Sequence, residues 1–148
     1  MTSLRISLIA AVAITGSLQA EKMMKLEQLP APVQKTVKEQ TQSAKMVGLS
    51  KEKEGGKTVY ELETSADGKS RDLMIDAAGA ILSVEQEVTL DSVPPAAKSS
   101  LEKKVGTGKI TKVETITKGS DVAYEAAFTT KSGKKAEYVV NADGTPHK

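Results

Sequence analysis

The sequence lacks the residue types on which most catalytic and metal sites are built. It contains no cysteine and no tryptophan, and its single histidine is His147. Disulfides, thiol nucleophiles and cysteine zinc sites are therefore excluded, and one histidine cannot form a zinc-binding cluster. The exposed-looking serines have no nearby histidine to activate them. We therefore expect a protein that is not an enzyme, has no catalytic residues and carries neither a cofactor nor a metal.

Aromatic residues and arginine are also scarce. Aromatics make up 3% of the chain, and Arg71 is the one arginine besides Arg5. Base stacking uses aromatic side chains, and guanine or phosphate recognition relies on arginine. The formal net charge is only +2, from 21 basic and 19 acidic residues. Nucleic acid is accordingly not an expected partner.

Residues 1–20 have the layout of a secretory signal peptide. Arg5 precedes an apolar run over residues 6–14, and small and polar residues follow as far as Ala20. The run is too short to cross a bilayer, which takes about 20 residues, so no stable membrane anchor is expected. Cleavage after Ala20 is favoured, with cleavage after Ser17 as the alternative. The mature protein would then be periplasmic or secreted.

The remainder of the chain contains an internal repeat. A shift of 64 residues places Tyr60-Glu61 on Tyr124-Glu125, and a shift of 65 places Gly79 on Gly144. This period is too long for a solenoid unit and is typical of a small α+β module present twice. The sequence therefore predicts two repeats, residues 21–88 and 89–148.

Each repeat is predicted to contain one helix followed by antiparallel strands. Apolar residues four apart after Leu29-Pro30 and Val93-Pro94 indicate the helices, and Gly106 can end the second one. Period-2 alternation and glycine-containing turns predict strands near residues 45–53, 58–64, 71–76, 81–87, 110–117, 122–129 and 135–141. The fold class is thus α+β, with two tandem αβββ(β) repeats forming one antiparallel sheet that carries its helices on one face. The last strand of the second repeat is expected to be nearly absent.

Alternation along the strands also assigns side chains to the two faces of this sheet. The helix-covered face is expected to hold Tyr60, Leu62, Leu73 and Ile75 from the first repeat, and Val122, Tyr124, Ala126, Phe128, Tyr138 and Val140 from the second. The opposite face then carries Glu61, Glu63, Asp72, Met74, Asp76, Glu125, Glu137 and Val139. Such an acidic face is either merely solvated or a docking surface. The candidate partner-binding residues are Glu61, Glu63, Asp72, Met74, Glu125 and Glu137.

The order of these motifs resembles that of the PepSY-like domains. The shared features are a Leu-Pro or Val-Pro helix start, a Tyr-Glu strand, a glycine hairpin and a closing turn, seen here at residues 76–79 and 141–144. The chain is similar to the secreted group likened to the β-lactamase inhibitor protein, in which two αβββ(β) copies make one curved sheet. The resemblance covers residues 26–148. It implies an extracytoplasmic binding or inhibitory module and transfers no catalytic residues.

Two functions remain in view. The first is a secreted or periplasmic binding module, in its narrower form protease-inhibitor-like, whose open sheet face binds an extracytoplasmic protein or peptide. The acidic face predicts that this partner is cationic. The alternative is an extracytoplasmic protein that uses the same carboxylates to bind a small ligand or a cation.

Overall fold

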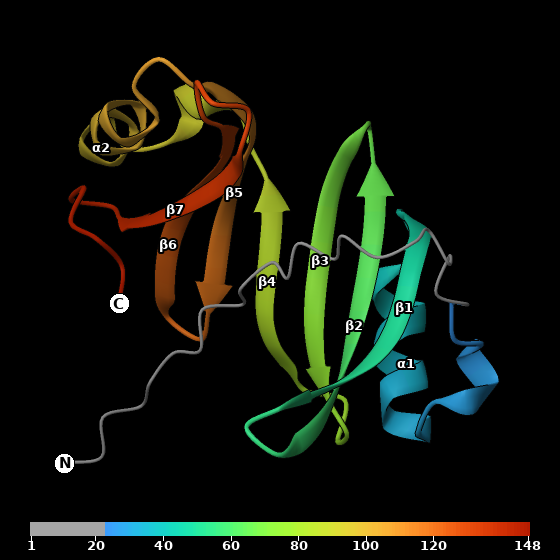
Figure 1. Cartoon of the computed structure of the whole chain (residues 1–148). Helices are drawn as coiled ribbons and strands as arrows, with labels where there is room; N and C mark the ends of the chain where they lie inside the picture. Colours follow the sequence, from blue (N-terminus) through green and yellow to red (C-terminus); the bar gives the residue numbers. More distant parts are fainter. Residues whose placement is uncertain (1–22) are drawn as a thin grey trace, which may run out of the picture.

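A single seven-stranded antiparallel sheet organises the chain (Figure 1). The computed structural model describes residues 23–148, so the predicted signal peptide and its cleavage site lie outside the described residues. The strands follow one another in chain order, β1-β2-β3-β4-β5-β6-β7. Their bounds are β1 (Lys45–Glu54), β2 (Lys57–Ala66), β3 (Lys69–Asp76), β4 (Ile81–Glu87), β5 (Lys109–Lys118), β6 (Asp121–Thr129) and β7 (Lys135–Asn141). The predicted meander is confirmed, with most strands one or two residues longer than expected.

The described part of the chain also contains two helices, α1 (Ala31–Gln40) and α2 (Pro95–Val105). A short 3-10 turn precedes each of them, η1 (Leu26–Gln28) and η2 (Leu90–Ser92). Pro30 and Pro94 occupy the N-cap positions, directly before the first helical residue. Gly106, with φ of 58°, ends α2 as the sequence predicted. Neither helix in residues 23–148 is long and apolar enough to cross a membrane.

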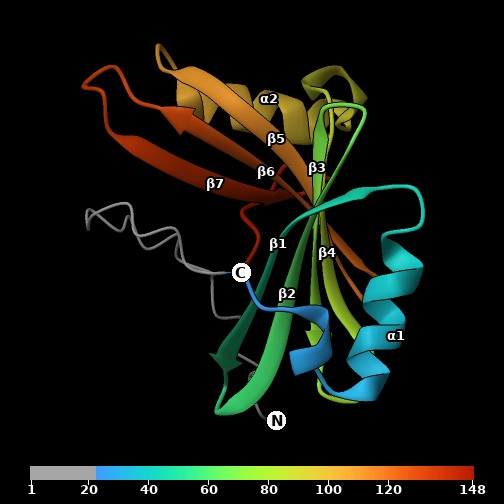
Figure 2. The same ribbon diagram turned by 90° about the vertical axis from the view of Figure 1, so that its right-hand side faces the viewer.

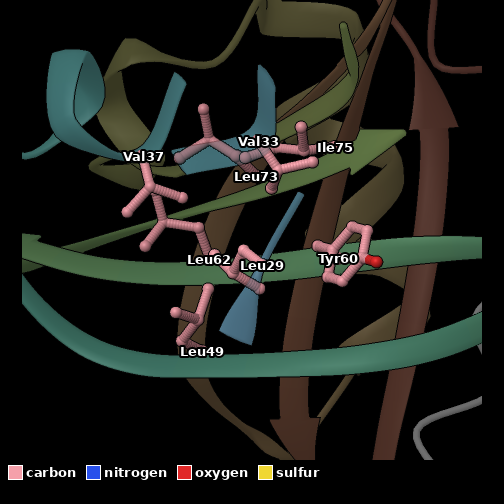
Figure 3. Packing of buried hydrophobic residues seen from close by; sticks show 8 residues of the cluster. All are labelled: Leu29, Val33, Val37, Leu49, Tyr60, Leu62, Leu73 and Ile75. Atoms are coloured by element: carbon pink, nitrogen blue, oxygen red, sulfur yellow. The ribbon is translucent and has the colours of Figure 1, made fainter. Parts of the chain in front are cut away.

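The core consists of two clusters, one beneath each helix. Val33 and Val37 of α1 pack against Leu62, Leu73 and Ile75 (Figure 3). In the second cluster α2 packs in the same way, with Ala97 and Leu101 against Val113, Ala126 and Val140. Both helices therefore cover the same face of the sheet, and Figure 2 shows them on the outer side of its bend. The predicted α+β arrangement with helices on one face is confirmed.

Three of the predicted core residues are not fully buried: Tyr124 and Tyr138 are half-buried, and Val122 is exposed. Val122 has the helix-facing parity of Tyr124 but is 41% exposed. It lies at the start of β6, paired with Thr117, and is absent from the residues that pack against α2. Alternation predicts a side chain's face correctly here, but burial also requires a helix above that part of the strand.

The two repeats share irregularities as well as elements. Both first strands carry a register shift, between Met46 and Gly48 in β1 and between Ile110 and Lys112 in β5. The fourth strand of the first repeat is β4, whereas the second repeat has only an isolated bridge between Val140 and Pro146. This confirms that the last strand of the second repeat is nearly absent.

Candidate functional site

The side of the sheet that no helix covers forms the inside of the bend (Figure 2), and we call it the open face. Residues that alternate with the core project onto this side. Glu61 and Glu63 flank the buried Leu62, and Asp72 precedes the buried Leu73. In the second repeat Glu125 precedes the buried Ala126. The structure thus brings the predicted carboxylates together on one surface.

The predicted site residues differ in how accessible they are. Glu63 and Glu137 are exposed, while Glu61, Asp72 and Glu125 are half-buried. Each of these carboxylates has some surface that a partner can reach. Among the remaining residues predicted for this face, Asp76 and Val139 are half-buried as well.

Met74 has the expected parity but not the expected accessibility. It lies opposite Glu61 in the ladder between β2 and β3, and its side chain is only 7% exposed. A side chain buried to this extent supports the sheet from the open side. It offers almost no surface for direct contact with a partner.

The most buried charges of the open face were not predicted from the sequence. Glu114 is 4% exposed, and the Nζ of Lys112 lies 2.8 Å from its Oε1. At this distance the ammonium donates a charge-assisted hydrogen bond to the buried Oε1. One carboxylate oxygen each from Asp72, Glu85 and Glu114 lie within 4.8 Å of one another. This acidic cluster spans β3, β4 and β5 and joins the two repeats.

The register of the strands makes several of the open-face carboxylates direct cross-strand neighbours. Glu63 lies opposite Asp72, and Asp72 lies opposite Glu85, which gives one continuous row. A second row runs from Glu87 through Glu114 to Glu125, because Glu114 lies opposite both of the others. Like charges directly opposite one another destabilise a sheet. The open face therefore holds more negative charge than packing alone would favour.

Carboxyl pKa values on this face are raised accordingly. Burial, hydrogen bonding to Glu52 and the charges of Glu52, Glu63 and Asp72 raise the pKa of Glu61 to about 7. Burial and the nearby Glu137 raise the pKa of Glu125 to about 7 as well. Glu61 and Glu125 are equivalent in the repeat, 64 residues apart. The same electrostatic arrangement therefore occurs twice on the open face.

In the acidic cluster around Lys112, burial and the neighbouring charges together set the pKa values. Burial raises the pKa values of Asp72 and Glu85, and neighbouring carboxylates contribute to both shifts. Burial also opposes the charge of Lys112, but its ion pair with Glu114 and the charges of Asp72 and Glu85 outweigh this and raise the pKa of the ammonium. Lys112 thus acts as a built-in counter-ion for the acidic cluster.

A hollow of about 370 Å³ opens on the open face and is lined by residues of β4 to β7 and the chain after β7, together with Glu54 at the end of β1. We call it the acidic hollow. Six carboxylate side chains and two ammonium groups line it, namely Glu54, Glu85, Glu114, Asp121, Glu125 and Glu137 with Lys112 and Lys118. Ile116, Ala123, Ala127, Val139 and Pro146 add apolar surface. The hollow therefore offers both negative charge and hydrophobic contact to a ligand.

The carboxylate oxygens of the acidic cluster are ligands that Ca²⁺ and Mg²⁺ accept. Within residues 23–148, Asp72, Glu85 and Glu114 are the acidic residues close enough together to hold such an ion. However, the ammonium of Lys112 already lies against Glu114. A divalent cation would have to displace this ammonium or bind beside it against like-charge repulsion.

Several solved structures have a similar fold. This chain is similar to a proposed periplasmic protein from Bacteroides eggerthii, at 14% identity and a TM-score of 0.65, covering 81% of this chain and 86% of that one. A DUF2874 family protein from Bacteroides ovatus matches at 15% identity and a TM-score of 0.61, covering 81% and 85%. A BLIP-like protein from Bacteroides fragilis matches at 18% identity and a TM-score of 0.56, and the match covers 79% of this chain and 82% of that one.

No protein-family model matches the chain, and no curated protein sequence does either. The solved structures support the fold expected from the β-lactamase-inhibitor-like resemblance. The resemblance to PepSY-like domains stays an interpretation of the motif order.

Proposed function

We propose that this chain is a non-enzymatic, extracytoplasmic binding module whose open face binds a cationic protein or peptide. A single observation carries the proposal: a bent sheet leaves one face uncovered and lines it with carboxylates in direct cross-strand opposition. Surface charges rarely improve stability, and adjacent like charges reduce it. A cationic partner would explain why the sheet carries adjacent carboxylates that reduce its stability.

The compartment follows from two independent lines of support. Residues 1–20 have the composition of a secretory signal peptide. One of the solved structures with the same fold is described as a proposed periplasmic protein. A periplasmic or secreted location agrees with both.

Binding would combine electrostatic attraction of the partner with burial of part of its surface. A face carrying one sign of charge accelerates the approach of an oppositely charged partner, and the bend of the sheet gives that partner a concave surface. An inhibitor-like role is the narrower form of the proposal, supported by the fold shared with the BLIP-like protein. In that role the open face would cover a functional surface of the partner.

The test compares two triple variants for binding to an immobilised lysine-rich peptide. The first, Glu61→Gln, Glu63→Gln and Glu125→Gln, removes three carboxyl groups from the open face. The second, Glu27→Gln, Glu39→Gln and Glu102→Gln, removes the same number of carboxyl groups from exposed residues on the helical elements. We expect the first to slow association and weaken its salt dependence, and the second to have little effect.

Two results would contradict the proposal. Equal losses in both variants would mean that binding follows net charge rather than this face. Unchanged binding in the open-face variant would mean that its carboxylates are merely solvated. Neutralising Lys35 and Lys38 on α1 provides a further control and should not reduce binding.

Cation binding is the second candidate function, favoured by the close approach of Asp72, Glu85 and Glu114. Calorimetric titration with calcium and with magnesium tests it directly. Heat that disappears in Asp72→Asn would support a metal site in the cluster, and a silent titration would eliminate this candidate.

A further inference from the structure

The acidic hollow has a mixed chemical character that restricts what can fill it. Glu85, Glu125 and Glu137 contribute negative charge, while Ile116 and Val139 contribute apolar surface. A bare inorganic cation would leave the apolar wall in contact with water. An apolar ligand would leave the carboxylates desolvated and unpaired, at a high cost. A group with an aliphatic stem and a cationic head matches both surfaces.

Charge inside the hollow is not balanced by the protein itself. Its lining holds six carboxylates against two ammonium groups. Lys112 is committed to Glu114, because its ammonium lies 2.8 Å from the buried Oε1 and donates a hydrogen bond to it. No described residue forms an ion pair with Glu85, Glu125 or Glu137, so these three carboxylates are the acceptors available to a ligand.

The spacing of acceptors favours a planar cation over a point charge. Glu125 and Glu137 are diagonal neighbours on adjacent strands, since Ala127, two residues after Glu125, lies opposite Glu137. Diagonal neighbours in a sheet are separated by about 7–8 Å, which leaves room for a guanidinium between their carboxylates. A guanidinium presents five donors in a rigid fork and can bond to two carboxylates at once. It is also less strongly hydrated than an ammonium, which favours its entry into a half-buried site.

We propose that the acidic hollow binds an arginine side chain of the partner polypeptide. The guanidinium lies among Glu85, Glu125 and Glu137, and the methylene stem packs on Ile116 and Val139. This inference rests on the proposed function and deepens it, because it places the specific subsite on the β4 to β7 half of the open face. The β1 to β3 half then contributes mainly to electrostatic steering.

The repeat supplies a matched pair of variants for the test. Glu125 lines the hollow, and its repeat equivalent Glu61 lies on β2 outside it. We would titrate Glu125→Gln and Glu61→Gln with a short blocked peptide that contains one arginine between alanines. A peptide with citrulline in place of arginine keeps the shape and removes the charge. Circular dichroism would establish that both variants are folded.

The wild-type protein is expected to bind the arginine peptide and not the citrulline peptide. Glu125→Gln should lower the affinity for the arginine peptide about tenfold, as expected for the loss of one charge-assisted hydrogen bond. Glu61→Gln should change its affinity by less than about twofold, because that carboxylate makes no direct contact and acts only through a screened charge. Glu137→Gln should reproduce the effect of Glu125→Gln.

The outcomes separate this inference from the proposed function. Equal weakening in Glu125→Gln and Glu61→Gln, or equal binding of the citrulline peptide, would overturn the arginine subsite alone. Binding of the lysine-rich peptide without any binding of the arginine peptide would do the same. Failure of every basic peptide to bind would overturn both.

Discussion

Glu114 on β5 and Glu125 on β6 lie directly opposite each other, and both line the acidic hollow. Two facing carboxylates repel each other, and partial burial strengthens the repulsion because less water screens it. Lys112 compensates one of them through its ion pair with Glu114. The other, Glu125, is partly protonated at neutral pH because its pKa is raised to about 7. The folded protein thus keeps an electrostatic cost at the surface where we place binding.

This cost predicts how stability depends on pH. The pKa values of Glu61 and Glu125 rise from 4.5 to about 7. The folded state therefore holds more protons than the unfolded state between about pH 4.5 and pH 7, so that stability is highest at the acidic end of this window. We expect the free energy of unfolding to decrease as pH rises through 7. Urea denaturation between pH 5 and pH 8.5 measures it.

Glutamine at these two positions provides the control for this prediction. A neutral amide cannot ionise, so Glu61→Gln with Glu125→Gln should flatten the pH dependence above pH 5. At pH 8 the double variant should be more stable than the wild type by on the order of 1 kcal/mol, since both groups are partly exposed and screened. A wild-type stability that rises between pH 5 and pH 8 would contradict the assignment.

Gly79 and Gly144 are predicted to be sensitive to any side chain. Both have positive φ, 85° and 82°, and a Cβ on either would lie 2.7 Å or less from a helix carbonyl oxygen, that of Pro32 or Ala96. Replacement by Ala should cost about 1–3 kcal/mol through backbone strain and displacement of the helix. Gly68 has a similar φ of 76° with open space around it. Thermal denaturation should show a smaller loss for Gly68→Ala than for either of the others.

The two repeat-related tyrosines are predicted to differ in their contribution to stability. Tyr60 is 6% exposed within the first core cluster, whereas Tyr124 is half-buried at the margin of the second. Tyr60→Ala should cost about 2–5 kcal/mol through lost burial and a residual cavity. Tyr124→Ala should cost less, because water can fill part of the vacated space. Equal denaturation midpoints for the wild type and Tyr60→Ala would contradict this packing.

The fold was predictable because local signals agreed with one another over two repeats. Glycine turns, strand alternation and the Leu-Pro and Val-Pro starts each marked the same element boundaries twice. The face of Glu61 followed from its position beside the buried Leu62. A sequence whose local preferences all favour one structure leaves few alternatives for the chain.

The centre of the acidic cluster was not predicted, for a definable reason. In β5 the register shift between Ile110 and Lys112 interrupts strict alternation, so parity alone does not fix the face of Lys112. Glu85 could have been assigned to the open face from the hairpin at residues 76–81, which sets it opposite Asp72. The burial of Glu114 depends on neighbouring strands, and periodicity within one strand carries no information about it.

Binding of a basic peptide is predicted to release protons. At pH 7 the carboxyl groups of Glu61 and Glu125 are partly protonated, since the pKa of each is about 7. A cationic partner favours the ionised form, which lowers these pKa values on binding. Arginine and lysine side chains stay charged throughout this range. Affinity should therefore rise by several-fold between pH 6 and pH 8.

Calorimetry in two buffers with different ionisation enthalpies measures this release. The binding heat should differ between phosphate and Tris at pH 7, and the difference should shrink in Glu61→Gln with Glu125→Gln. The groups facing Glu125 are Glu85, Glu114 and Glu137 with Lys112, and those facing Glu61 are Glu52, Glu63 and Asp72. His147 also lines the acidic hollow, so His147→Asn serves as the control and should leave the release in place. Affinity that falls as pH rises, or heats independent of the buffer, would show that ionisation of these two carboxyl groups is not linked to binding of the cation.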